Sequence, residues 1–425
     1  MKILFSILLI FNSYFLYSQT DNSTYNNLSY LFNQKQYFKL KDNLKFDKSA
    51  LNKYQLEYFN ALTLSVFNKP AESNGFINEL LNDHSNELSD SMKINLLNSK
   101  LLNCINLYQY EEALNVTEKL LAEFKPLLKK DETDELINSA LIWKAASDLA
   151  PQTISKTGDT RIESRKDMAG LTNIKVNVNS NEEEFIFDTG ANFSTVSNSI
   201  AKKLGMEFLT GTVEVGTSTG LKVNAELAYA DTLRIGNMIF TNVLFLVLPD
   251  KDLSFADGAY VIKGIIGFPV IEDMKQITLS ENEIFIPEIT ENSFYDNLSM
   301  NGLIPLIQTI VDSDTLIFSF DTGARKTMLY TLYYEKYRSG VDSNYTLLDI
   351  KFGGAGGEVI MKGFNLNKLN FEIASGKVTL DSISLIREHF TDNDEFIYGN
   401  LGNDFIKSFR EMTINFENMY VDFKD

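Results

Sequence analysis

The segments Phe185-Ile186-Phe187-Asp188-Thr189-Gly190-Ala191 and Phe318-Ser319-Phe320-Asp321-Thr322-Gly323-Ala324 are two copies of one pattern. In each copy an apolar run ends in Asp-Thr-Gly-Ala. A single Asp at a strand end is ordinary and commonly binds its own backbone. Two copies in matching sequence indicate two carboxyl groups that meet across a pseudo-two-fold axis. One member of such a pair can hold a proton while the other stays ionised.

The residues before each Asp repeat as well. In both copies a stretch of alternating polarity is followed by a short polar turn and then by the strand that enters the Asp. The two turns are Asn179-Ser180-Asn181 and Asp312-Ser313-Asp314. Alternation around a short polar turn is typical of a β-hairpin, so each copy is predicted to begin with one.

Three further features follow each Asp in the same order. They are a glycine-containing segment, an element with two glycines, and an expected alternating strand. In the first copy they lie at 216–220, 264–268 and 276–287, and in the second at 353–357, 399–403 and 411–423. Two units are too few for a solenoid. We therefore expect two β lobes packed together.

These residues resemble the pepsin-like and retropepsin-like aspartic proteases. In that family each lobe, or each subunit of a homodimer, carries Asp-Thr/Ser-Gly-Ala/Ser, a flap hairpin and a downstream hydrophobic-hydrophobic-Gly element. Ile265-Ile266-Gly267 matches this element, whereas Asn400-Leu401-Gly402 departs from it because Asn400 replaces an apolar residue. Ser194 and Thr327, six residues after each Asp, make the pattern closer to retropepsins than to pepsin. The resemblance covers about residues 170–425.

The resemblance implies an aspartic endopeptidase that hydrolyses peptide bonds with water activated by an Asp188/Asp321 dyad. The two carboxyls would share one proton, and neither a cofactor nor a metal is expected. We expect the hydroxyl groups of Thr189 and Thr322 to bind backbone groups across the lobe interface.

The small residues after each Asp are expected to support the same arrangement. Gly190 and Gly323 let the backbone pass close to the opposite loop, where a Cβ would clash. Ala191 and Ala324 are small for the same reason, and local backbone amides can bind the carboxylates.

The two glycine-containing segments are interpreted as hairpin tips that close over a bound peptide. A phosphate cradle at 353–357 is disfavoured because no Lys-Ser/Thr follows it. A long turn without substrate contact is the alternative. If one lobe supplies the main flap, the tip in the first lobe is favoured. The candidate substrate-binding residues are Thr217, Ser218, Thr219, Gly354, Ala355 and Gly356.

Two other functions stay open at this point. One is a catalytically inactive peptide-binding protein of the same fold. The other is a scaffold in which helices near the N-terminus are the working part and the protease domain is vestigial. The intact Asp-Thr-Gly-Ala in both copies argues against the second, because a vestigial site is free to lose either Asp.

Other chemistries lack the residues that they need. The chain has two histidines, His84 and His389, and no Gly-x-Ser-x-Gly elbow for a serine hydrolase. A metal site of His and Cys lacks ligands. The single cysteine, Cys104, lies in an apolar pattern and is predicted to be a core residue. The net charge of −18 argues against a nucleic-acid partner.

The N-terminus resembles an export signal. Met1-Lys2 gives a positive start, residues 3–17 are mostly apolar, and the small Ser18 precedes Gln19. We expect cleavage between Ser18 and Gln19 and an exported protein, periplasmic or secreted. An uncleaved anchor is the alternative. No other long apolar run is present, so no membrane span is expected after cleavage.

Residues 20–150 show helical rather than strand periodicity. Apolar residues recur at helical spacing, as in Ile94, Leu97, Leu101 and Ile105, and Gly75 is the single glycine there. The segments 107–114 and 31–40 weakly resemble tetratricopeptide turns. A concave surface that binds a protein partner is one possibility.

The sequence thus predicts a multidomain α plus β protein: an α-helical, repeat-like domain followed by a two-lobed all-β acid-protease-like fold. We expect a monomer that acts on a peptide or unfolded protein. The predicted divisions are a signal peptide at 1–18, a helical domain at 19–150, a polar linker at 151–170, β lobe 1 at 171–287, an interlobe connection at 288–301 and β lobe 2 at 302–425.

Overall fold

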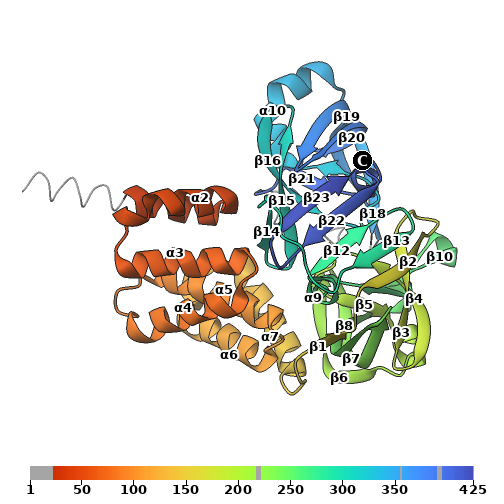
Figure 1. Cartoon of the computed structure of the whole chain (residues 1–425), viewed down its shortest axis with the longest axis horizontal. Coiled ribbons are helices and arrows are strands. Elements are labelled where there is room, and N and C mark those ends of the chain that lie inside the picture. The colour runs from red at the N-terminus through yellow and green to blue at the C-terminus, as the bar shows by residue number, and fades with distance from the viewer. Residues whose placement is uncertain (1–22, 217–221, 355–356, 390–394, 425) are drawn as a thin grey trace, which may run out of the picture. The chain divides into compact units, whose positions relative to one another are not determined.

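A computed structural model describes residues 23–216, 222–354, 357–389 and 395–424 (Figure 1). The expected export signal lies outside the described residues. A helical region over residues 23–146 precedes two lobes built of β-sheet, which confirms the predicted fold class. The chain divides into two compact units, one ending at Asn103 and the other running from Cys104 to Asp425.

The first unit is a set of helices around an apolar core. After a first helix at residues 23–33, the ordered helices are α2 (Tyr37–Asp47), α3 (Lys53–Val66), α4 (Pro70–Asp83) and α5 (Asp90–Asn106), the last of which crosses the unit boundary. Asn52 caps α3 through a reciprocal exchange with Gln55, and a proline starts α4. Leu40, Phe59 and Leu62 are among the fully buried core residues.

Two further helices belong to the second unit, together with the β lobes. They are α6 (Tyr110–Lys119), extended by a π-helical turn at Leu120–Phe124, and α7 (Lys130–Ala146). The sequence instead groups all helices up to residue 150 in one domain. The tetratricopeptide-like interpretation stays a hypothesis. Cys104 is fully buried, as predicted.

Lobe 1 and the C-terminal hairpin share one large sheet. Its strands run in the order β23-β22-β12-β13-β2-β3-β4-β11-β5-β8-β7-β6, with β1 paired to β8. Their bounds are β1 (Thr153–Lys156), β2 (Thr160–Lys166), β3 (Thr172–Val178), β4 (Asn181–Phe187), β5 (Ser194–Ser197), β6 (Glu207–Gly216), β7 (Lys222–Ile235), β8 (Met238–Leu248), β11 (Gly264–Ile266), β12 (Gln276–Leu279), β13 (Glu283–Ile286), β22 (Glu411–Asn415) and β23 (Tyr420–Lys424).

Lobe 2 has a sheet of its own, in the order β14-β15-β16-β21-β17-β20-β19-β18. Its strands are β14 (Leu298–Asn301), β15 (Ile304–Val311), β16 (Asp314–Phe320), β17 (Met328–Leu329), β18 (Leu348–Gly354), β19 (Gly357–Ile373), β20 (Gly376–Ile386) and β21 (Gly399–Leu401). The short strands β9 (Ser254–Phe255) and β10 (Tyr260–Val261) pair separately. The remaining helices are α8 (Asn198–Lys203), α9 (Phe268–Asp273), α10 (Thr331–Asn344) and α11 (Asn403–Ile406).

The predicted hairpins at the start of each repeat are present, as β3–β4 and β15–β16. Their two-residue turns have positive φ at both central positions: 46° and 71° at Asn179 and Ser180, and 46° and 87° at Asp312 and Ser313. Two consecutive positive φ values define the turn type that matches the twist of paired strands. The repeat therefore extends to backbone conformation.

Each single alternating strand predicted at 276–287 and 411–423 is in fact a hairpin. The first is β12–β13 and the second is β22–β23, and strands β12 and β22 pair with each other. The C-terminal hairpin thus joins the sheet of lobe 1. The predicted boundaries place it in lobe 2 with the rest of residues 302–425.

The predicted linker at 151–170 contains two strands of the lobe 1 sheet, β1 and β2. Strand β2 pairs with β13 and β3. Its buried side chains are Thr160, Ile162 and Ser164, and charged residues occupy the opposite face. Because two of the three inward residues are small and polar, the segment has too few apolar residues to be recognised as a strand. Strand β14 similarly occupies the end of the predicted connection at 288–301.

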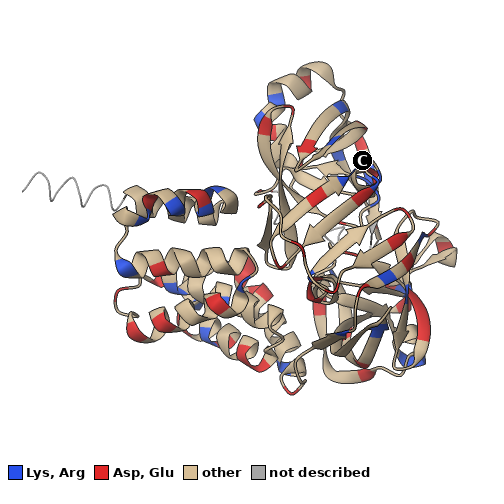
Figure 2. Cartoon of the chain, in the orientation of Figure 1, with Lys and Arg blue, Asp and Glu red and all other residues tan. Residues whose placement is uncertain are grey.

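Charged residues of both signs are scattered over the helices and over both lobes (Figure 2). Acidic residues exceed basic ones, 57 to 39. Among the described residues, no helix is long and apolar enough to cross a membrane.

Candidate active site

The two Asp residues follow equivalent strands of the two lobes. Strand β4 ends just before Asp188 and runs parallel to β11, and β16 ends just before Asp321 and runs parallel to β21. The Asp188 amide donates to the Ile266 carbonyl and the Asp321 amide to the Leu401 carbonyl, each at 3.0 Å. Both turns are therefore held by the element that the sequence places downstream of each Asp.

The structure brings the two carboxyl groups into hydrogen-bond contact. Oδ1 of Asp188 accepts from the Gly190 amide at 2.8 Å. Oδ1 of Asp321 accepts from the Gly323 amide at 2.7 Å and from the Ala324 amide at 3.0 Å. Burial removes water from the carboxyl of Asp188, and the neighbouring carboxyl of Asp321 adds a like charge. Both effects raise the pKa of Asp188 well above its usual range. A pair of this kind can hold one proton between two carboxyls.

Thr189 and Thr322 cross-link the two turns beneath the carboxyls. The Thr189 amide donates to Oγ1 of Thr322 at 2.9 Å, and the Thr322 amide donates to Oγ1 of Thr189 at 3.1 Å. Each hydroxyl in turn donates to a carbonyl of the opposite lobe, at Phe320 and Phe187. These are the interlobe bonds expected from the sequence.

The glycines of the two turns lie against the opposite carboxyl. A Cβ atom on Gly190 would lie 2.5 Å from Cγ of Asp321, and one on Gly323 would overlap the carboxyl of Asp188. Ser194 and Thr327 accept hydrogen bonds from the amides of Gly267 and Gly402, each at 3.1 Å. The geometry thus accounts for glycine in both turns.

One position breaks the symmetry between the lobes. Asn400 of β21 lies beside Ser319 of β16, whereas the matching pair in lobe 1 is Ile265 beside Ile186. Nδ2 of Asn400 donates to Oδ2 of Asp321 at 3.3 Å. Asn400, the residue that departs from the family pattern, therefore makes a polar contact to the dyad.

The candidate flap residues are only partly described. Strands β6 and β7 form a hairpin whose last described pair is Gly216 with Lys222, and Gly354 pairs with Gly357 at the end of the β18–β19 hairpin. The glycine-containing segments therefore lie at hairpin ends, as predicted. The predicted contact residues Thr217, Ser218, Thr219, Ala355 and Gly356 lie outside the described residues.

Two residues of α7 contact lobe 1 in a way that was not predicted from the sequence. Asn138 of α7 binds the backbone of Glu214 in β6 through both ends of its side-chain amide, and the Glu214 amide donates to Oδ1 at 2.9 Å. Trp143 of α7 packs on Phe193 with ring centroids 6.1 Å apart. Phe193 follows the Asp188 turn closely. Nothing local in the sequence of α7 indicates a role in the β lobe, because both residues also fit an ordinary helix.

The helix pair α6–α7 is anchored to the β region at a second point. The Tyr108 hydroxyl donates to the Pro269 carbonyl in α9 at 2.8 Å, and Nε2 of Gln152 donates to Oδ2 of Asp273 at 2.7 Å. Desolvation raises the pKa of the Asp273 carboxyl, and the hydrogen bonds from Gln152 and Tyr108 oppose that rise. This contact lies directly after the Ile265-Ile266-Gly267 element.

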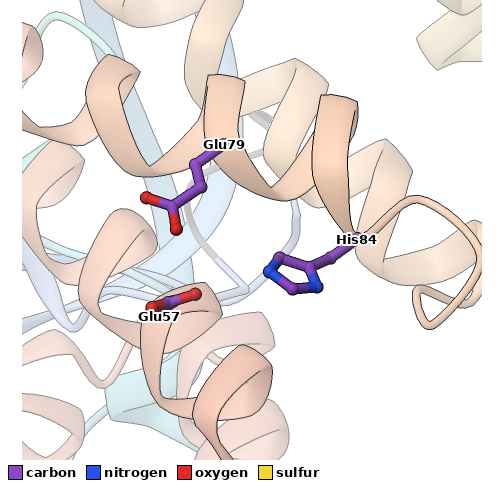
Figure 3. A group of neighbouring side chains, drawn as sticks. All are labelled: Glu57, Glu79 and His84. Carbon is purple, nitrogen blue, oxygen red and sulfur yellow. The ribbon is translucent and has the colours of Figure 1, made fainter.

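A separate cluster in the first unit brings together Glu57, Glu79 and His84 (Figure 3). Their potential ligand atoms lie within 4.8 Å of one another. Nζ of Lys53 is 3.4 Å from Oε1 of Glu57 and 3.8 Å from Oε1 of Glu79. Lys53 thus pairs with both carboxylates, and we assign no metal to the cluster.

Two β lobes that each present one Asp from a matched turn define an acid-protease-like architecture. In agreement with this, residues 174–270 match the aspartyl protease family, so this part of the chain is a retropepsin-like aspartyl protease domain. The matched segment contains Asp188 and Ile265-Ile266-Gly267. The repeat adds Asp321 in the other lobe. No curated protein sequence matched the chain.

Proposed function

We propose that this protein is an aspartic endopeptidase that uses Asp188 and Asp321 to activate water. The observation that carries the proposal is the contact between the two carboxyls, held by the reciprocal Thr189–Thr322 bonds. A retropepsin-like domain around Asp188 supports it further. The family implies a peptide substrate, and we propose unfolded protein segments as its source.

The proposed reaction needs no group beyond the dyad, one water and the substrate. The ionised carboxyl takes a proton from the water as its oxygen bonds to the peptide carbon, and the protonated carboxyl donates its proton to the carbonyl oxygen. The carbon–nitrogen bond then breaks, and the leaving nitrogen takes a proton from the dyad. This shared-proton chemistry is that of aspartic proteases as a class.

The expected export remains part of the proposal. Its support is the short apolar run at residues 3–17 followed by Ser18-Gln19. Sequencing the N-terminus of protein isolated from its natural host tests it. A mature chain that begins near Gln19 is the expected result, and a soluble cytoplasmic chain that retains Met1 would overturn it.

The proposed activity is tested by incubating the purified full chain with a denatured protein mixture over a series of pH values. We expect a bell-shaped dependence of rate on pH, on the acid-to-neutral side. Asp188→Asn and Asp321→Asn should each remove nearly all hydrolysis, and the double variant should be little worse, because residues that act as a unit are non-additive.

Two results would overturn the proposed mechanism. One is wild-type turnover in either single variant. The other is an activity that a metal chelator abolishes and a hydroxyl-containing transition-state mimic leaves intact. Circular dichroism on both variants controls for unfolding. A folded wild-type chain that binds peptides and cleaves none would identify the inactive peptide-binding protein instead.

A further inference from the structure

The environment of the two carboxyls differs at one point, the side-chain amide of Asn400. Both turns supply backbone amides to their own Asp. Among the contacts described for the dyad, only Asp321 receives a hydrogen bond from a side-chain amide, at Oδ2. The backbone amides of its own turn bind the other oxygen, Oδ1. Both oxygens of Asp321 are therefore bound by N–H groups.

The orientation of Asn400 follows from its neighbour on β16. The hydroxyl of Ser319 donates to Oδ1 of Asn400 at 2.7 Å, and Ser319 is nearly fully buried. With the carbonyl end of the amide bound to Ser319, the NH₂ end of Asn400 faces Asp321. The chain Ser319–Asn400–Asp321 therefore points a donor at the carboxylate.

Lobe 1 offers no equivalent of this chain. Ile186 and Ile265 occupy the matching positions beside Asp188, and neither side chain can donate a hydrogen bond. An N–H donor stabilises the ionised form of a carboxyl more than its protonated form. The asymmetry therefore favours negative charge on Asp321.

We propose that Asn400, oriented by Ser319, keeps the negative charge of the dyad on Asp321, so that Asp188 carries the shared proton. Asn400 is then a positioning residue for the proposed reaction. Asp321 takes the proton from water and Asp188 donates to the substrate carbonyl. The raised pKa of Asp188 agrees with this assignment. The catalytic part of the inference rests on the proposed function, whereas the charge distribution does not.

Other ionisable groups lie on the elements around the dyad. Lys326 follows the Asp321 turn and lies 3.8 Å from Asp404 of α11, beside Arg325. Lys166 of β2 donates to Asn403. The hydrogen bonds and ion pairs described for these groups do not include Asp188 or Asp321. The group that faces Asp321 most directly is thus Asp188 itself.

The inference is tested on the full chain by carboxyl-carbon NMR of ¹³C-labelled aspartate across a pH titration. The Asp188→Asn and Asp321→Asn variants assign the two signals. In the wild type, the first ionisation of the pair should move the Asp321 signal more than the Asp188 signal. Asn400→Leu replaces the amide with an apolar side chain of similar size and should make the pair about tenfold weaker as an acid.

Two further variants keep the test decisive. Ser319→Ala preserves the shape of the site and should shift the first ionisation in the same direction by a smaller factor, even if Asn400→Leu fails to fold. Asn365→Leu removes another Ser–Asn pair of lobe 2, to Ser384, and should leave the titration unchanged.

The outcomes separate the inference from the proposed function, because the titration needs no hydrolysis. If the chain cleaves nothing and the titration responds to Asn400→Leu and Ser319→Ala, the charge distribution stands and the proposed function falls. If Ser319→Ala and a folded Asn400→Leu both titrate within twofold of the wild type, or if Asp188 shows the larger first shift, the inference is wrong whatever the activity.

Discussion

The Thr189 and Thr322 side chains join the two lobes by a reciprocal pair of hydrogen bonds, each accepting from the backbone amide of the other at 2.9 and 3.1 Å. Both residues are essentially inaccessible to solvent. Because a buried amide that loses its acceptor bears the full cost of desolvation, this junction is sensitive to single changes.

Replacing Thr322 by Val should destabilise the protein by about 1–3 kcal/mol, because the Thr189 amide and the Phe187 carbonyl each lose a buried partner. Chemical denaturation of the full chain measures the change. Thr322→Ser keeps the hydroxyl and should lose much less. Equal stability of the Val variant and the wild type would show that the interlobe bonds contribute nothing measurable.

The raised pKa of Asp188 predicts a pH-dependent difference in stability. The folded chain retains the Asp188 proton at pH values where the unfolded chain, with a pKa near 3.8, has released it. This contribution to the unfolding free energy is therefore present at low pH and is lost as pH rises through the folded pKa.

Asp188→Asn removes that contribution, so its stability relative to the wild type should increase as pH rises from about 4 through the folded pKa of Asp188. Other carboxyls largely cancel in the difference. Thermal unfolding of both proteins across this range measures it. A difference that stays constant, or that changes in the opposite direction, would contradict a raised pKa at Asp188.

Asn138 should protect the exposed edge of β6. Strand β6 is the last strand of its sheet order, so among the described residues no strand pairs with the outer side of the Glu214 backbone. The Asn138 amide supplies both a donor and an acceptor there. Asn138→Ala should accelerate hydrogen exchange of the Glu214 amide by about tenfold. A change of that size corresponds to the loss of the net free energy of about one hydrogen bond.

The matched control for this experiment is Asn115→Ala on α6. Asn115 is on the helical pair as well, but its described hydrogen bond is to the nearby Glu112. Its removal should leave exchange at Glu214 unchanged. If both variants change exchange equally, the effect comes from weakening of the helices in general rather than from the Asn138 contact.

A chain that starts at Asp167 should not form the native fold. It lacks β1 and β2, and β2 pairs with both β13 and β3 inside the lobe 1 sheet. It also lacks the Tyr108 and Gln152 contacts to α9. We expect an aggregated or molten chain by circular dichroism and gel filtration.

A chain that starts at Asp90 is the comparison, because it retains α5 to α7 and both strands. It should be folded and soluble. A well-folded chain from Asp167 would show instead that residues 151–170 behave as the linker that the sequence predicts.

The arrangement of the candidate site was largely predictable because it depends on a repeat. Asp188 and Asp321, the hairpins before them and the glycine-containing elements after them recur in one order, and similar local sequences adopt similar turns. The crossing of the Thr189 and Thr322 hydroxyls follows from two such turns meeting about an axis. For these features, local sequence and the family pattern carried the necessary information.

The tertiary structure was needed to identify features whose local sequence pattern is weak and contacts between segments that are distant in the sequence. Strand β2 buries Thr160 and Ser164, so polar residues alternate with charged ones and its sequence resembles a linker. Only its pairing with β13 and β3 shows that it is a strand. The bonds from Asn138 to Glu214 and from Asn400 to Asp321 join residues on separate elements. The sequence by itself determined the two turns and the carboxyls that they present, because turn conformation depends on neighbouring residues. Only the tertiary structure decided which side chains stabilise those carboxyls, because hydrogen bonds between distant segments depend on how the strands pack.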